Sequence, residues 1–145
     1  MARNAINNRA FNRSLKRYIK NADKKGTKAI RGVGLQALKM VMTKSPEDEG
    51  TFRGNWNVGI NTKATSIDSR YTNETNKGAS DPIKFAEGSG RIGSIKGGEI
   101  INISNALPYA MRLEFDGWSD QAPAGMVRLT LIELTFWLKA QNRRV

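Results

Sequence analysis

The chain contains no cysteine and no histidine among its 145 residues. Disulfides, thiolate nucleophiles, imidazole bases and the commonest zinc ligands are thereby excluded. An enzyme built from this sequence would have to work with carboxylates, lysine or hydroxyl groups alone. Long hydrophobic runs are missing as well, because no apolar stretch approaches the roughly 20 residues that span a bilayer.

The amino-terminal stretch MARNAINNRAFNRSLKRY lacks the apolar segment of a secretory signal. We therefore expect the protein to be made and assembled in a cytoplasm. Apolar residues make up 39% of the chain and charged residues 26%, which is typical of a globular rather than a disordered protein. This length and composition predict one domain over 1–145, with no cofactor and no metal site.

Acidic residues are scarce where basic residues are dense. Residues 1–44 carry 12 Lys and Arg against one acid, Asp23, whereas 45–120 carry 8 basic and 11 acidic residues. The net charge of +11 therefore belongs mainly to the first segment. A clustered charge of this kind predicts a polyanionic neighbour, such as nucleic acid, an anionic membrane surface or an acidic protein face.

Apolar residues recur at steps of three and four from Ile6 to Lys44, which predicts helix. We favour one long basic helix over 1–44, kinked at Gly26, although two helices joined there also fit the pattern. We predict that a basic stripe on its opposite side contacts DNA or an acidic partner; the alternative is a solvated face that only aids solubility. No base-reading motif accompanies it, so any DNA contact is expected to be independent of sequence. The stripe comprises Arg9, Arg13, Arg17, Lys20, Lys24, Lys28 and Arg31.

Two short strands are predicted after this helix. Pro46 ends it, and alternation of apolar residues indicates a strand within Phe52–Ile60, with Trp56 in the core, and another within Glu99–Ala106. The 61–98 segment between them has little periodicity and many glycines, so we expect a flexible inserted loop that orders on contact with a partner. Within it, PIKFAEG (82–88) is a candidate for a helical turn. The fold class is therefore α+β: a long basic N-terminal helix, a small antiparallel sheet with a long inserted loop, and a C-terminal helix packed on the sheet.

The predicted C-terminal helix, Pro123–Arg143, is apolar on two sides. One stripe holds Val127, Leu131, Leu134 and Leu138. Burial against two surfaces is the usual solution for such a helix, one inside the chain and one against a partner. We predict that an oligomer interface forms from the second stripe and a neighbouring tryptophan, namely Trp118, Leu129, Ile132 and Phe136.

Two stretches of the sequence carry a family resemblance. SPEDEGTFRGNW (45–56) and NALPYAMRLEFDGWSDQAPAGMVRLT (105–130) resemble, in order and separation, the two signatures of small neck and tail-completion proteins of tailed bacteriophages. The chain departs from the pattern at Glu49, at Phe52 and by one extra residue before Gly117. The structural motif residues are Pro46, Gly50, Arg53, Trp56, Asn105, Tyr109, Glu114, Gly117, Pro123 and Arg128.

The resemblance implies a structural virion protein and not an enzyme. Such a subunit is expected to form a homo-oligomeric ring, usually hexameric, between the head–tail connector or adaptor protein and the tail terminator or tail tube, with genomic DNA passing through the channel. Two alternatives stay open: a free-standing, sequence-independent nucleic-acid-binding protein, and, more remotely, a hydrolase that uses Glu114 with Asp116.

Local chemistry gives expectations for the second signature. We expect Tyr109, Leu113 and Phe115 to seat a short helix on the sheet, and Gly117 to turn the chain. Ser119 or Asp120 is expected to accept hydrogen bonds near the start of the last helix. Glu114 and Arg128 are expected to form an ion pair across the turn. The acidic turn Glu47–Glu49 is expected to pair with a neighbour's basic helix.

Overall fold

The computed structural model describes residues 2–21, 26–46, 52–68, 81–117, 119 and 124–143. Most of these residues are helical, and two strands form an antiparallel pair, so the α+β class is confirmed. No helix in these ranges is both long and apolar enough to cross a membrane. The elements are α1 (Ala2–Asn21), α2 (Gly26–Lys44), the 3-10 turn η2 (Arg53–Asn55), β1 (Trp56–Ile60), α3 (Asp81–Gly93), β2 (Ile101–Asn105), α4 (Ala110–Phe115) and α5 (Val127–Arg143).

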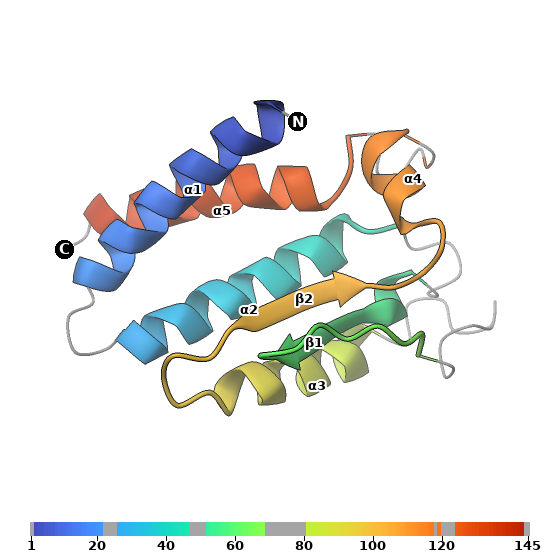
Figure 1. The fold of residues 1–145 in the computed structure, drawn as a ribbon, viewed down its shortest axis with the longest axis horizontal. Coiled ribbons are helices and arrows are strands. Elements are labelled where there is room, and N and C mark those ends of the chain that lie inside the picture. The colour runs from blue at the N-terminus through green and yellow to red at the C-terminus, as the bar shows by residue number, and fades with distance from the viewer. Residues whose placement is uncertain are drawn as a thin grey trace.

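Helix α2 occupies the middle of the molecule (Figure 1). On one side Leu38, Val41 and Met42 join the main core with β1, α3 and α4. On the other side Val33 packs with Leu134 of α5 in a second cluster, which α1 covers. The layers therefore run from α1 and α5, through α2, to the two-stranded sheet and α3.

The strands pair as the apolar alternation predicts. Val58 lies opposite Ile103, and Ile60 lies opposite Ile101. Because side chains alternate along a strand, this register places these apolar residues and Trp56 on one face. Trp56 is buried, as predicted, and its indole N–H donates to the Ser45 hydroxyl at 2.7 Å.

The prediction of one helix over 1–44 is wrong. Helix α1 ends at Asn21, α2 begins at Gly26, and α1 lies alongside α5 (Figure 1). The reason is long-range packing, since Phe11, Leu15 and Tyr18 of α1 contact a cluster whose buried members include Leu134 and Leu138. A single straight helix could not bring these faces together.

The prediction of a flexible loop over 61–98 is wrong for 81–93, whereas the described residues 61–68 contain neither helix nor strand. The second half of the 61–98 segment holds α3, a helix of 13 residues, and Ile92 and Ile95 are buried. Gly88, which suggested mobility, is a packing residue: a Cβ there would lie 2.6 Å from Leu38 Cδ2 and 3.0 Å from Val58 Cγ2. The glycine lets α3 approach α2 and β1 closely. Residues 69–80 lie outside the described ranges.

Candidate functional site

Much of the predicted basic stripe lies on α1. Arg9, Arg13, Arg17 and Lys20 are all exposed there, and Lys28 is exposed at the start of α2. Lys16, which was not among the predicted cations, is also exposed. It shares this face of α1 with Arg9, because residues seven positions apart lie above one another after two helical turns. We call Arg9, Arg13, Lys16, Arg17 and Lys20 the α1 basic face.

One predicted member of the stripe does not belong to it. Arg31 is partly buried, and its guanidinium donates to the backbone carbonyl of Ile95, so it ties α2 to the segment after α3. Lys24 lies outside the described residues. The continuous stripe of seven cations is therefore wrong as a single surface, because α1 and α2 are separate helices.

A hollow of about 330 Å³ lies between α1 and the end of α5. The amide of Asn142 donates to the backbone carbonyl of Ser14 at 3.4 Å and links the two helices there. Among the described residues that line the hollow, four are cations and none is a carboxylate. We call it the α1–α5 groove; its lining comprises Arg13, Ser14, Arg17, Lys139, Asn142 and Arg143.

Arg53 of the first signature holds the end of α2. Its Nε donates to the Ser45 carbonyl at 2.9 Å, and its Nη2 donates to the Thr43 carbonyl at 3.0 Å. The last carbonyls of a helix lack partners within that helix, so a guanidinium placed there satisfies them and complements the helix dipole. Arg53 thus fixes where α2 ends and where the chain turns toward β1.

Glu114 of the second signature holds the start of α5. Its carboxylate accepts the backbone N–H groups of Met126, Val127 and Arg128 at 2.9, 2.8 and 3.0 Å. The Arg128 Nε also donates to it at 3.0 Å, and Arg128 Nη2 donates to the Glu114 carbonyl, so the predicted ion pair is confirmed. A buried carboxylate from another helix therefore caps α5.

The start of α5 corrects one expectation and leaves another untested. The carboxylate that accepts these first N–H groups of α5 is Glu114, and Asp120, proposed for that position, lies outside the described residues. Helix α5 begins at Val127, so Pro123, also outside them, does not start it. Gly125 adopts a φ of +85°, and a Cβ there would lie 2.5 Å from the Glu114 carbonyl oxygen. The turn before α5 therefore depends on a glycine.

The two signatures meet in the folded chain. Asn105 Nδ2 donates to the Phe52 carbonyl at 2.9 Å, and the rings of Phe52 and Tyr109 lie 5.9 Å apart. Leu113 is buried as expected, and Gly117 has the positive φ of a turn residue. Phe115 does not help to seat α4: its side chain is 46% exposed, with the Arg128 guanidinium 4.8 Å from its ring. Pro46 is buried, whereas Gly50 lies outside the described ranges.

Helix α5 is apolar on a buried side and on an exposed one. Leu134 and Leu138 are buried, while Ile132 is 40% exposed and Phe136 is 65% exposed. Leu129 is partly buried next to them along the helix. Val127 does not join the buried stripe, because 47% of it is exposed. We call Leu129, Ile132 and Phe136 the α5 apolar face; Trp118, predicted to join it, lies outside the described residues.

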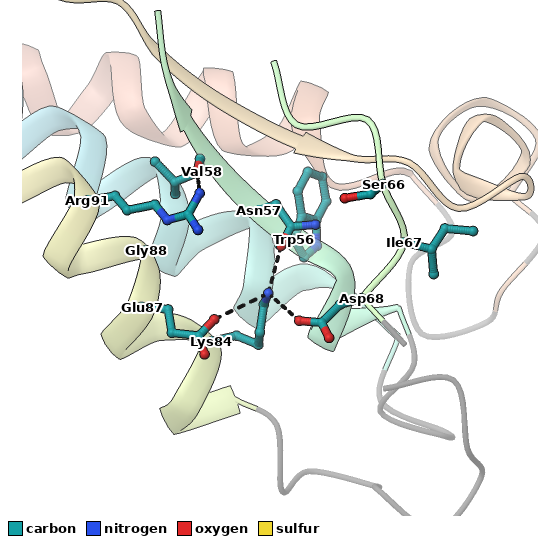
Figure 2. Close-up of a pocket in the computed structure, with 10 residues that line it drawn as sticks. All are labelled: Trp56, Asn57, Val58, Ser66, Ile67, Asp68, Lys84, Glu87, Gly88 and Arg91. Atoms are coloured by element: carbon teal, nitrogen blue, oxygen red, sulfur yellow. Dashed lines mark hydrogen bonds and ion pairs between the residues drawn. The ribbon is translucent and has the colours of Figure 1, made fainter. Parts of the chain in front are cut away.

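A polar pocket of about 300 Å³ surrounds Lys84, within the segment predicted as an inserted loop (Figure 2). The lysine is 5% exposed and extends from α3 toward β1. Its Nζ donates to Asn57 Oδ1 at 2.7 Å and to Asp68 Oδ2 at 2.8 Å, and lies 3.6 Å from Glu87 Oε2. These oxygens match the three N–H donors of an ammonium group.

The charges around this pocket balance. Two carboxylates, Asp68 and Glu87, face two cations, Lys84 and Arg91, and the Arg91 guanidinium donates to the Val58 carbonyl at 2.9 Å (Figure 2). The backbone N–H of Asp68 donates to Asn55 Oδ1 at 2.7 Å. We therefore interpret the cluster as a structural contact that holds the 61–68 segment against β1 and α3, rather than as a reaction centre.

The turn between α3 and β2 contains an acid with a shifted pKa. The backbone N–H groups of Lys96 and Gly97 donate to the Glu99 carboxylate, at 2.9 and 2.6 Å. These hydrogen bonds favour the ionised form and hold the pKa of Glu99 below its ordinary value of 4.5. The turn is therefore held by a carboxylate that stays charged at neutral pH.

Within the described ranges, no group of three or more His, Cys, Asp or Glu side chains is arranged to hold a metal ion. Comparisons with models of protein families, with curated proteins and with solved structures find nothing that matches this chain. The interpretation of its function therefore depends on its own sequence and geometry.

Proposed function

We propose that this protein is a structural subunit of a bacteriophage virion, which assembles into a ring at the neck between the capsid connector and the tail. The main observation in support is that side chains of the two signatures bind backbone groups of the same chain. Arg53, Asn105 and Glu114 each bind the chain's own backbone, at the end of α2, before β1 and at the start of α5. Side chains used in this way fix the directions of helices, which supports an assembly role without catalysis.

The subunit interface proposed for the ring is the α5 apolar face. Ile132 and Phe136 are one turn apart and exposed, on a helix whose other side is buried in the second cluster. A closed ring needs a surface that is held in one orientation relative to the rest of the subunit. The Glu114 cap supplies that orientation by fixing the first turn of α5.

Native mass spectrometry of the purified chain tests the interface. We expect a closed oligomer for the wild-type chain and a folded monomer for Phe136→Asp, because a charge would be buried in each contact. Ile100→Asp is the matched control: this residue is 63% exposed but lies just before β2, away from α5, so the oligomer should persist. A wild-type monomer, or an oligomer that survives Phe136→Asp, would contradict the interface.

The virion assignment has a separate test. Purified particles of the source virus should contain this polypeptide in several copies at the head–tail junction, as seen by electron microscopy with a specific antibody. A protein absent from particles, yet able to bind nucleic acid as a monomer, would instead be the free-standing nucleic-acid-binding protein that the basic composition also allows.

A further inference from the structure

We infer that the α1–α5 groove binds the phosphate backbone of a polynucleotide, with cations from both ends of the chain acting together. Arg13 and Arg17 come from α1, whereas Lys139 and Arg143 come from the last two turns of α5. This inference rests on the proposed function in one respect: if the protein is a neck subunit, the bound polynucleotide is the packaged genome. The groove's ability to bind phosphate is tested independently.

The groove carries an excess of positive charge. Four cations line it, and the described residues contribute no carboxylate to the lining. Like charges one turn apart on a helix, such as Arg13 and Arg17 or Lys139 and Arg143, destabilise that helix slightly. The Lys84 pocket, of similar size, is lined by two cations and two carboxylates. The described residues therefore do not neutralise the positive charge of the groove, and an external anion would supply the negative charge.

The shape of the charged surface favours an extended ligand. The α1 basic face continues beyond the groove in both directions, to Arg9 and to Lys20. At a rise of about 1.5 Å per residue, these two positions lie about 16 Å apart along the helix. A single bound phosphate would occupy only the groove, whereas a polymer with repeated charge would contact the whole face. A polynucleotide strand carries a phosphate every 3.4 Å or so along a duplex.

The side-chain chemistry favours phosphate. Three of the four groove cations are arginines, whose planar guanidinium groups bind phosphate oxygens through two parallel hydrogen bonds. Ser14 and Asn142 add polar atoms to the lining. None of the described residues that line the groove has an aromatic ring on which a base could stack, so the groove is suited to the backbone of a duplex rather than to its bases.

The helix dipole opposes this binding only weakly. The end of α5 carries a partial charge equivalent to about −0.5, which four full positive charges exceed. Lys139 and Arg143 lie in the last turns of α5, where cations also stabilise the helix itself. The net potential of the groove is thus positive.

Fluorescence anisotropy with a labelled random-sequence duplex of about 30 base pairs tests the inference over a range of salt concentrations. We expect Arg13→Gln/Arg17→Gln and Lys139→Gln/Arg143→Gln each to weaken binding about tenfold or more. Each pair should also lower the slope of log affinity against log salt by about 2, since each lost phosphate contact contributes about 1. Circular dichroism would verify that the variants are folded.

The matched control is Lys63→Gln/Lys96→Gln, which removes the same charge from two exposed positions outside the groove. An equal loss in all three double variants would overturn the inference, because net charge alone would then explain binding. Absence of duplex binding, or equally tight binding of polyglutamate, would also overturn it. These outcomes are separate from ring assembly: a chain that forms rings without binding duplex contradicts the groove alone, and a monomer that binds through the groove contradicts the ring alone.

Discussion

Glu114 shows how one side chain determines the position of a whole element. It is 7% exposed, and three backbone N–H groups and a guanidinium surround it. Hydrogen bonds to a charged acceptor contribute more than neutral ones, and the N–H groups at a helix start have no partner within the helix. The orientation of α5 therefore depends on a residue of α4.

Glu114→Gln tests this dependence. The amide keeps the shape of the side chain but replaces one acceptor oxygen with a donor that faces N–H groups. We expect the free energy of unfolding in urea to fall by about 2–3 kcal/mol. Glu133→Gln is the matched control on α5: its carboxylate is 55% exposed and pairs with Lys44 at 2.6 Å, so its loss should cost below about 1 kcal/mol. Equal effects of the two changes would show that Glu114 is not a special cap.

At the scale of single residues, the sequence predicted contacts between neighbouring elements better than contacts across the chain. The Glu114–Arg128 pair and the burial of Trp56 followed from turn spacing and strand alternation, and both are confirmed. The link from Arg31 to Ile95 could not be predicted, because both the position of α3 and the break between α1 and α2 depend on tertiary packing. The groove was missed for the same reason, since it joins α1 to α5.

Elements that lack their own periodic signal are held by specific contacts. Within α3, the stretch DPIKFAEGSGRIG contains three glycines, which are poor helix formers, so the sequence suggested a loop with at most one helical turn. The helix is stabilised by burial of Ile92 in the main core and by the Lys84 cluster. Packing of this kind overrides local propensity, and a single sequence does not reveal it.

The Lys84 cluster gives a prediction at this scale. Lys84→Met leaves the Asp68 carboxylate in a largely buried place without its nearest cation, and should lower the free energy of unfolding by about 3 kcal/mol. Adding Asp68→Asn removes the unpaired charge, so the double variant should recover about 1–2 kcal/mol relative to the sum of the single changes. Chemical denaturation of the four proteins measures this coupling. If the two single changes add in the double variant, the Lys84–Asp68 ion pair does not hold the 61–68 segment in place.

At the scale of the whole molecule, the described residues form two buried clusters that share helix α2. Leu38 of α2 belongs to the main core, and Val33 of α2 belongs to the cluster with α5. Since α2 contributes to both, loss of either cluster removes a packing surface from the other. We therefore expect the sheet side and the helical side to unfold together.

Tryptophan fluorescence can test this cooperativity. Trp56 belongs to the main core, whereas Trp137 packs against the second cluster, with the Tyr18 ring 5.7 Å away. Replacing the other tryptophans with phenylalanine gives one variant that reports on Trp56 and another that reports on Trp137. In each, the fluorescence and circular dichroism midpoints in urea should coincide. Separate midpoints would show that the clusters unfold independently.

The internal cap on α5 has a consequence for how this helix meets foreign anions. Free helix starts attract phosphate and sulfate, yet here a tethered carboxylate already occupies that place at a high effective concentration. An external anion would have to displace the Glu114 carboxylate from these N–H groups, and two negative charges would then lie close together in a buried place. The start of α5 is thus unavailable to external anions, whereas its last turns carry cations. A polyanion that binds α5 should therefore contact its C-terminal end and not its N-terminal end.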